Sequence, residues 1–142
     1  LMGSSMFDTQ WMDTVKKAHP HGDFLFVAEG VFFYFKKPQV ADVMAQLARR
    51  FSGAHILFDV TSSWMCRNQH KMSAVKMTKA PFRLELDRIS EIETWAPNLS
   101  VRDVRHYGDF KEWKQAGFLR YWMLRLVPFL KNAGRIVSCD IK

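Results

Sequence analysis

The most apolar run of the chain, residues 24–34, contains a single carboxylate, Glu29. Five apolar residues, Phe24–Ala28, lead up to Glu29 and Gly30, which is the length and composition of a buried strand that ends at the acid. Ligands of open α/β sheets bind at the carboxyl ends of the strands, so Glu29 is a candidate ligand-binding residue. The alternative is that Glu29 only caps the following turn or pairs with a nearby lysine, and for an isolated acid after a strand this alternative is the commoner one.

The hydrophobic period changes after this run and predicts a helix followed by a second strand. Pro38 suits the first turn of a helix. The apolar face of that helix consists of Val40, Val43, Met44, Leu47 and Phe51. Residues 54–60 form another short apolar run, and this predicted strand finishes in a carboxylate, Asp59. Strand, helix and strand within about forty residues predict a βαβ unit with parallel strands, which would bring Glu29 and Asp59 to the same edge of the sheet.

The remainder of the chain continues this alternation without a linker or an internal repeat. We expect one α/β domain over residues 1–142, because this length allows a single sizeable core. Its further predicted elements are helices at 7–17, within 61–80, at 90–95 and at 118–130, and strands at 99–107 and 135–141.

Charge and cysteine content change this picture little. The net charge of +7 and the pI of about 9.7 would suit nucleic acid if the basic residues lay on one face, but they are dispersed along the sequence. A generic basic surface is therefore favoured over an anionic partner, and nucleic acid is the weakest option. Cys66 and Cys139 have no metal-type spacing, and His19 and His21 have no third ligand nearby, so no metal is expected. We expect a cytoplasmic protein with reduced thiols and no membrane partner.

Several segments together resemble a known enzyme family. They are the run Ala28–Phe35, the end of the following helix at 47–54, and Leu57-Phe58-Asp59, with further similarity at Phe7-Asp8, Trp11, residues 91–95 and the closing strand. In these segments the chain resembles leucine carboxyl methyltransferase-like enzymes, which include bacterial O-methyltransferases of the polyketide-biosynthesis type. The similarity extends over nearly the whole chain.

The resemblance implies a class I, Rossmann-like methyltransferase fold that uses S-adenosylmethionine and releases S-adenosylhomocysteine. This chain would be the C-terminal half of such a sheet, with strands four to seven, flanking helices and a helical insertion at about 61–97. Its last strand would be antiparallel. The implied activity is methyl transfer to the carboxylate or hydroxyl oxygen of a small molecule.

The resemblance also implies positions for the cofactor. Glu29 and Gly30 would lie near its methionine part, and Ser5 and Met6 fall where the family has an aspartate followed by an apolar residue against the adenine. Ser5 departs from that pattern, because a hydroxyl forms a hydrogen bond but lacks the charge of a carboxylate.

Residues around the methyl acceptor are harder to assign. Tyr34, Trp64, Arg83 and Trp95 are candidates for substrate binding, although the aromatic residues suit core packing equally well and Arg83 suits a solvated surface. No catalytic residue is assigned, because Asp59 and His55 are candidates for a general base by position only and a carboxylate acceptor would need no base.

The family's glycine-rich cofactor loop is missing from this sequence, which contains no Gly-x-Gly. We therefore expect a fragment of an enzyme, incomplete and inactive by itself, whose first strand has an exposed apolar edge. A missing N-terminal half, a processed precursor or a homodimer would cover that edge. The alternative from another functional class is a non-catalytic remnant or interaction module that associates through the edge.

Overall fold

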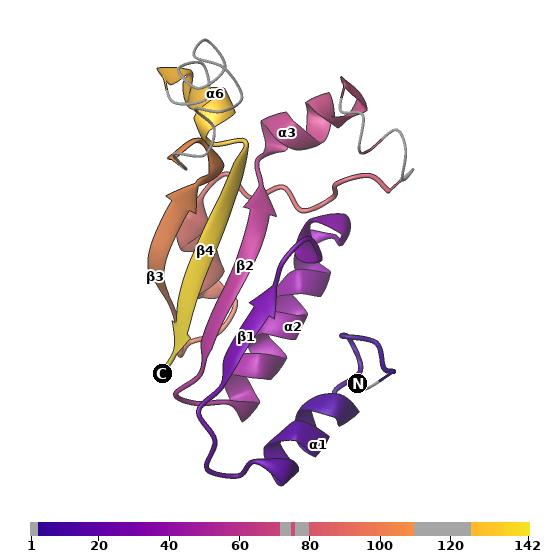
Figure 1. The fold of residues 1–142 in the computed structure, drawn as a ribbon, viewed down its shortest axis with the longest axis vertical. Coiled ribbons are helices and arrows are strands. Elements are labelled where there is room, and N and C mark those ends of the chain that lie inside the picture. The colour runs from indigo at the N-terminus through magenta and orange to yellow at the C-terminus, as the bar shows by residue number, and fades with distance from the viewer. Residues whose placement is uncertain (1–2, 72–74, 76–79, 110–125) are drawn as a thin grey trace.

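The computed structural model describes residues 3–71, 75, 80–109 and 126–142, which form a mixed four-stranded sheet with helices packed against it (Figure 1). The strands are β1 (Leu25–Ala28), β2 (His55–Thr61), β3 (Leu99–His106) and β4 (Gly134–Ile141). The α-helices are α1 (Gln10–Ala18), α2 (Lys37–Arg50), α3 (Ser63–Asn68) and α6 (Pro128–Lys131). Short 3₁₀ helices are η1 (Phe32–Tyr34), η2 (Gln69–Lys71), η3 (Ile89–Thr94) and η4 (Tyr107–Asp109).

The sheet has the strand order β1-β2-β4-β3, so the last strand of the chain lies between the second and the third. β1 and β2 are parallel and are connected through α2, which confirms the predicted βαβ unit. β4 is antiparallel to both of its neighbours, as the family resemblance implied for the closing strand. The predicted α/β sheet of about four strands with flanking helices and an antiparallel last strand is confirmed.

Most predicted elements are present with shifted ends. The predicted helix at 90–95 is the 3₁₀ helix η3, and the predicted strand at 99–107 is β3. Most of the predicted helix at 118–130 falls outside the described residues, which contain only α6 at its end, with Pro128 as the first residue of α6. Met72 and Met77 of the predicted helix within 61–80 also fall outside them.

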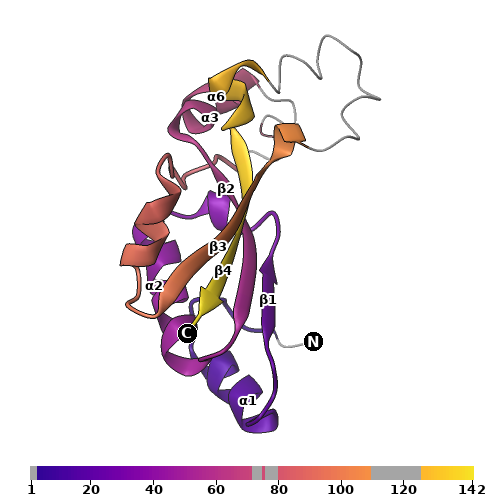
Figure 2. The ribbon, with the colours of Figure 1, turned by 90° about the vertical axis from the view of Figure 1, so that its left-hand side faces the viewer.

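One face of the sheet is packed against the helices. The apolar stripe of α2 is fully buried, and it faces the residues of β2 that alternate with exposed ones. Figure 2 shows α2, α3 and the η3 segment on this same side of the sheet. The central buried residues of this layer are Val40, Val43, Met44, Leu47, Phe51, Ile56, Phe58 and Val60. Because side chains on a strand alternate between faces, the residues of β2 between these buried ones point to the opposite face of the sheet.

The opposite face, which we call the open face, exposes apolar side chains. Leu25 is 67% exposed, Val27 59% and Leu57 37%. Val27 and Leu57 lie side by side in the register of β1 and β2, so the three residues form one apolar strip. Within the described part of the chain, β1 pairs with β2 only and is an edge strand. The apolar edge predicted from the sequence is thus present in these residues.

None of the helices within the described ranges has both the length and the apolar character required to cross a membrane.

Candidate functional site

A small cavity lies on the open face, where β1 ends beside β2. Its volume is about 200 Å³, and it is lined by Val27, Glu29, Leu57, Phe58, Asp59, Tyr107 and Ile136. We call it the Asp59 pocket. The strand register explains how it forms. Ala28, the last residue of β1, pairs with Phe58, so Glu29 follows directly beside Asp59. Ile136 of β4 pairs with Asp59 and supplies the neighbouring apolar wall.

Asp59 is the most deeply buried acid of this pocket, with 5% of its surface exposed. Its Oδ2 accepts two hydrogen bonds, from the backbone N–H of Gly30 at 3.0 Å and from the hydroxyl of Tyr107 at 3.2 Å. Its Oδ1 is buried and has no hydrogen-bond partner among the described residues. Burial raises the pKa of Asp59, the two hydrogen bonds oppose this rise, and the charge of Glu29 adds to it. Asp59 therefore has a fixed orientation, and its Oδ1 is enclosed without a hydrogen-bond partner in the described part of the chain.

Gly30 forms the turn that places Glu29 at the rim of this pocket. Its φ of +67° lies in the left-handed region, which glycine adopts without the steric cost that a Cβ would bring. Because its N–H points to Asp59, the turn after β1 is tied to the adjacent strand. The side chain of Glu29 itself remains exposed and lines the pocket.

Tyr107 reaches Asp59 from the end of β3, across β4. Gly134, the first residue of β4, makes this possible: a Cβ there would lie 2.5 Å from the Tyr107 ring. Burial raises the pKa of the Tyr107 hydroxyl, and the neighbouring charge of Asp59 raises it further, so the group stays protonated and donates its hydrogen bond. Sequence reasoning missed Tyr107, because only the insertion of β4 between β2 and β3 brings it near Asp59.

Met6 lies in a second cavity, also of about 200 Å³, which we call the Met6 cavity. Its other walls are Trp11, Phe26, Val27, Ala28, Val31, Phe32, Val43, Leu47 and Ile56. Val27 lines both cavities, but the walls of the Met6 cavity include Val43 and Leu47 of α2 on the covered side, whereas the Asp59 pocket lies on the open face. Ser5 is exposed, and its hydroxyl accepts the N–H of Phe7 at 3.3 Å, which stabilises a local turn.

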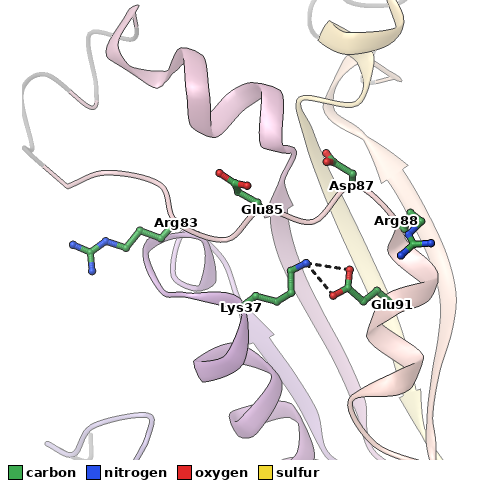
Figure 3. Close-up of a pocket in the computed structure, with 6 residues that line it drawn as sticks. All are labelled: Lys37, Arg83, Glu85, Asp87, Arg88 and Glu91. Carbon is green, nitrogen blue, oxygen red and sulfur yellow. Dashed lines mark hydrogen bonds and ion pairs between the residues drawn. The ribbon is translucent and has the colours of Figure 1, made fainter.

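Two of the predicted substrate-binding residues lie on neighbouring segments away from the Asp59 pocket. The ring of Tyr34 packs against Phe33 and Phe82, and the N–H of Arg83 donates to the carbonyl of Phe33 at 2.7 Å. Arg83 lines a separate cavity of about 380 Å³, which we call the charged pocket (Figure 3).

The charged pocket has equal numbers of basic and acidic side chains. They are Lys37, Arg83 and Arg88 against Glu85, Asp87 and Glu91. Lys37 and Glu91 form an ion pair of 2.9 Å, and Figure 3 shows the Arg83 side chain pointing away from that pair. This charge balance gives the charged pocket no preference for an acidic substrate.

The other two predicted substrate-binding residues are also outside the Asp59 pocket. Trp95 follows η3 and packs against the hydrophobic core, and Trp64 is half-buried in α3. His55, a base candidate by position, is at the opposite end of β2 from Asp59, where its Nδ1 lies 2.6 Å from Asp140 Oδ1. The structure thus brings Asp59, but not His55, next to Glu29.

The chain is similar to known proteins in sequence and in fold, although no family model matches it. It is 23% identical over 140 residues to the tetracenomycin polyketide synthesis O-methyltransferase TcmP of Streptomyces glaucescens, in a match that covers 96% of this chain and 51% of TcmP. The chain therefore spans about half the length of this curated relative. The resemblance to polyketide-type O-methyltransferases is confirmed as a distant similarity.

Solved structures support the fold. A DUF574 family protein from Streptomyces avermitilis superposes with a TM-score of 0.61 at 7% identity, over 98% of this chain and 53% of that protein. TnmH superposes with a TM-score of 0.52 at 13% identity, over 99% of this chain and 34% of TnmH. In both cases the chain matches only part of a larger structure.

The described residues meet part of what S-adenosylmethionine requires. The cofactor carries a positive sulfonium and ammonium, and the Asp59 pocket offers two carboxylates, one of them with an unpartnered buried oxygen. The Met6 cavity offers an apolar wall at the same edge strand, on the side of α2. Each cavity is smaller than the roughly 300 Å³ at which ordinary small-molecule sites begin. The residues fit one side of such a cofactor rather than a complete enclosure.

Proposed function

We propose that the chain forms the carboxylate-bearing side of the active site of an S-adenosylmethionine-dependent O-methyltransferase. The observation that carries this proposal is the presence of Glu29 and Asp59 in one pocket at the end of β1, on an open face with exposed apolar side chains. The distant similarity to TcmP supports the reaction class. In this proposal residues 1–142 are one partial domain that contributes strands four to seven of the methyltransferase sheet, with residues 61–97 as a helical insertion.

S-adenosylmethionine, when bound, would supply an activated methyl group on a positively charged sulfur. The contribution of this chain is to hold and orient it. Glu29 favours the positive charge electrostatically, Met6 and its cavity offer an apolar contact for the adenine, and Ser5 is available for a hydrogen bond. Gly30 acts through its turn, which sets the position of Glu29 against Asp59.

The open face and the β1 edge point to a second polypeptide segment in the working enzyme. An exposed apolar edge strand is a template for pairing, and exposed apolar side chains next to it favour burial. We propose that the segment carrying the glycine-rich cofactor loop packs on Leu25 and Val27 and completes the site. A second copy of this chain is the other occupant of the edge that we consider.

Isothermal titration calorimetry with S-adenosylhomocysteine tests this function. The proposal predicts saturable binding by the chain, weakened at least tenfold by Glu29→Gln, because the amide keeps the shape of the side chain and removes its charge. Asp140→Asn is the matched control, because Asp140 is a half-buried acid of β4 on the same face, paired with His55 at the opposite end of β2. Absence of binding, or equal losses in both variants, contradicts the proposal.

The exposed strip of Leu25, Val27 and Leu57 also favours a second function, that of a non-catalytic interaction module. This alternative predicts self-association without cofactor binding. Light scattering coupled to size-exclusion chromatography measures the first property, and the calorimetric titration measures the second. A dimer that does not bind S-adenosylhomocysteine would favour the module over the enzyme.

A further inference from the structure

We propose that the ring of Tyr107 contacts the positively charged sulfur of the cofactor and makes the Asp59 pocket selective for an alkylated cation over its neutral counterpart. This inference rests on the proposed function and adds a binding residue that determines which form of the cofactor is held. The pocket would prefer S-adenosylmethionine, whose sulfur is fully alkylated and positive, to S-adenosylhomocysteine, whose sulfur is neutral.

The Asp59 pocket combines negative charge with apolar walls. Glu29 and Asp59 supply its two carboxylates, and none of its described lining residues is basic. Its apolar walls come from three adjacent strands and from the residue that follows β3, and they are Val27, Leu57, Ile136 and Tyr107. An alkylated cation matches both features, because it is positively charged and its surface consists of carbon groups.

Two contacts fix the ring of Tyr107 at this pocket. Its hydroxyl donates to Asp59 Oδ2 at 3.2 Å, and its ring lies so close to Gly134 that a Cβ there would be 2.5 Å away. Tyr107 is nevertheless 37% exposed, so the side chain has surface that a ligand can contact. A ring that is already fixed loses little conformational entropy on binding, so more of the contact free energy contributes to affinity.

The ring and the carboxylates favour different cations. A carboxylate favours an ammonium group, which can donate hydrogen bonds to it, whereas a sulfonium has no hydrogen to donate. An aromatic ring attracts a cation through the negative charge of its face and requires no hydrogen bond. Burial raises the pKa of the Tyr107 hydroxyl and the charge of Asp59 raises it further, so Tyr107 remains a phenol bonded to Asp59. The ring is therefore the part of the pocket that recognises the alkylated sulfur.

Phe58 is the other aromatic residue among the described lining residues, and it does not offer its ring to this pocket. Its side chain is 1% exposed and packs against the ring of Phe32, in the layer beneath the opposite face. Within the described residues that line the pocket, Tyr107 is thus the aromatic side chain that a ligand on the open face can reach.

Calorimetric titration of the chain with S-adenosylmethionine and S-adenosylhomocysteine tests the inference. We expect the unaltered chain to bind S-adenosylmethionine about tenfold more tightly, and Tyr107→Leu to lower this ratio about fivefold, as loss of a partly desolvated cation–π contact does. Tyr107→Phe is the matched control, because it keeps the ring and removes only the hydroxyl, and it should retain the ratio. A merely structural role of Tyr107 would change both affinities by the same factor.

A second measurement covers the case in which Tyr107→Leu fails to fold. Choline and 3,3-dimethylbutan-1-ol have the same shape, but only choline has a charged, methylated centre. In an NMR titration of the unaltered chain, the ring signals of Tyr107 should shift with saturation on addition of choline and should not shift with the alcohol at the same concentration.

The outcomes separate this inference from the proposed function. A ratio that Tyr107→Leu leaves unchanged, a ratio that Tyr107→Phe lowers equally, or ring signals that respond to both probes or to neither would overturn the inference. Binding of S-adenosylhomocysteine that weakens in Glu29→Gln would still support the proposed function in each of those cases. Absence of binding by both forms of the cofactor would contradict the function and the inference together.

Discussion

The two faces of the sheet differ in what covers them, and β2 shows the difference residue by residue. Phe58 is 1% exposed and packs against the ring of Phe32, whereas its neighbour Leu57 is 37% exposed on the open face. The covered face therefore accounts for folding, and the open face carries Glu29, Asp59 and Tyr107 together with apolar side chains that lack a cover in the described residues. Side chains along β2 alternate between the two faces, so the residues that pack the core and the candidate functional residues lie on opposite sides of the sheet.

The largest expected effect compares these two neighbours on β2. Phe58→Ala should lower the free energy of unfolding by about 3–5 kcal/mol, because it leaves a cavity in the packed layer. Leu57→Ala should cost less than about 1 kcal/mol, because much of this side chain already contacts solvent. Urea denaturation followed by circular dichroism gives both values. Equal losses would show that the open face is packed in the same way as the covered one.

A smaller loss is expected from Gly134→Ala, at the crossing of Tyr107 over β4. The added Cβ would lie 2.5 Å from the ring, so the ring must move and its hydrogen bond to Asp59 breaks. We expect destabilisation of about 1–3 kcal/mol, the usual range for overpacking.

The control for this prediction is a double-mutant cycle with Tyr107→Ala, measured by the same urea denaturation. Once the ring is removed, Gly134→Ala should cost little. If the cost persists without the ring, the glycine is required for another reason.

Asp59→Asn isolates the contribution of a buried acid to the pH dependence of stability. Burial raises the pKa of Asp59 in the folded chain above its pKa in the unfolded chain. The free energy of unfolding therefore decreases as the pH rises from below the unfolded-state pKa through the folded-state pKa. Asparagine does not ionise, so the free energy of unfolding of the variant should increase relative to that of the unaltered chain as the pH is raised from acidic to neutral. Thermal unfolding at a series of pH values measures this difference. A difference that is constant with pH would contradict the burial of an ionisable group at this position.

The smallest effect on stability is expected at the exposed strip of β1. Leu25→Lys should change the free energy of unfolding by no more than about 0.5 kcal/mol, because the side chain is 67% exposed. The same charge should prevent pairing or packing on the open face. Light scattering before and after the substitution measures association. If the Leu25→Lys variant associates as strongly as the unaltered chain, the interface lies elsewhere.

The sequence was sufficient for the part of the fold that local patterns determine. The period of the apolar residues predicted β1, α2 and β2, and parallel pairing predicted that Glu29 and Asp59 would meet. It was insufficient for Tyr107, because the contact depends on β4 crossing between β2 and β3 and on a glycine at its first residue. Asp59 also lies inside β2 rather than after it, since β2 continues to Thr61.

The predicted acceptor-binding residues show another limit of sequence reasoning. Tyr34, Trp64, Arg83 and Trp95 were chosen by residue type, and type alone does not distinguish packing from binding. The described contacts of Tyr34 and Trp95 are with other apolar residues, and those of Arg83 are in the charged pocket. Their role toward a substrate remains a prediction.

Chemical-shift mapping of S-adenosylhomocysteine onto the backbone amides tests the central claim most directly, with two glycines as reporters. Both have positive φ, but the N–H of Gly30 donates to Asp59 at the pocket and that of Gly53 donates to Ile141 at the other end of the sheet. We predict that the Gly30 signal shifts with saturation while the Gly53 signal does not. A titration in which neither signal shifts, or in which Gly53 shifts and Gly30 does not, would contradict the assignment of the cofactor to the carboxylate pair.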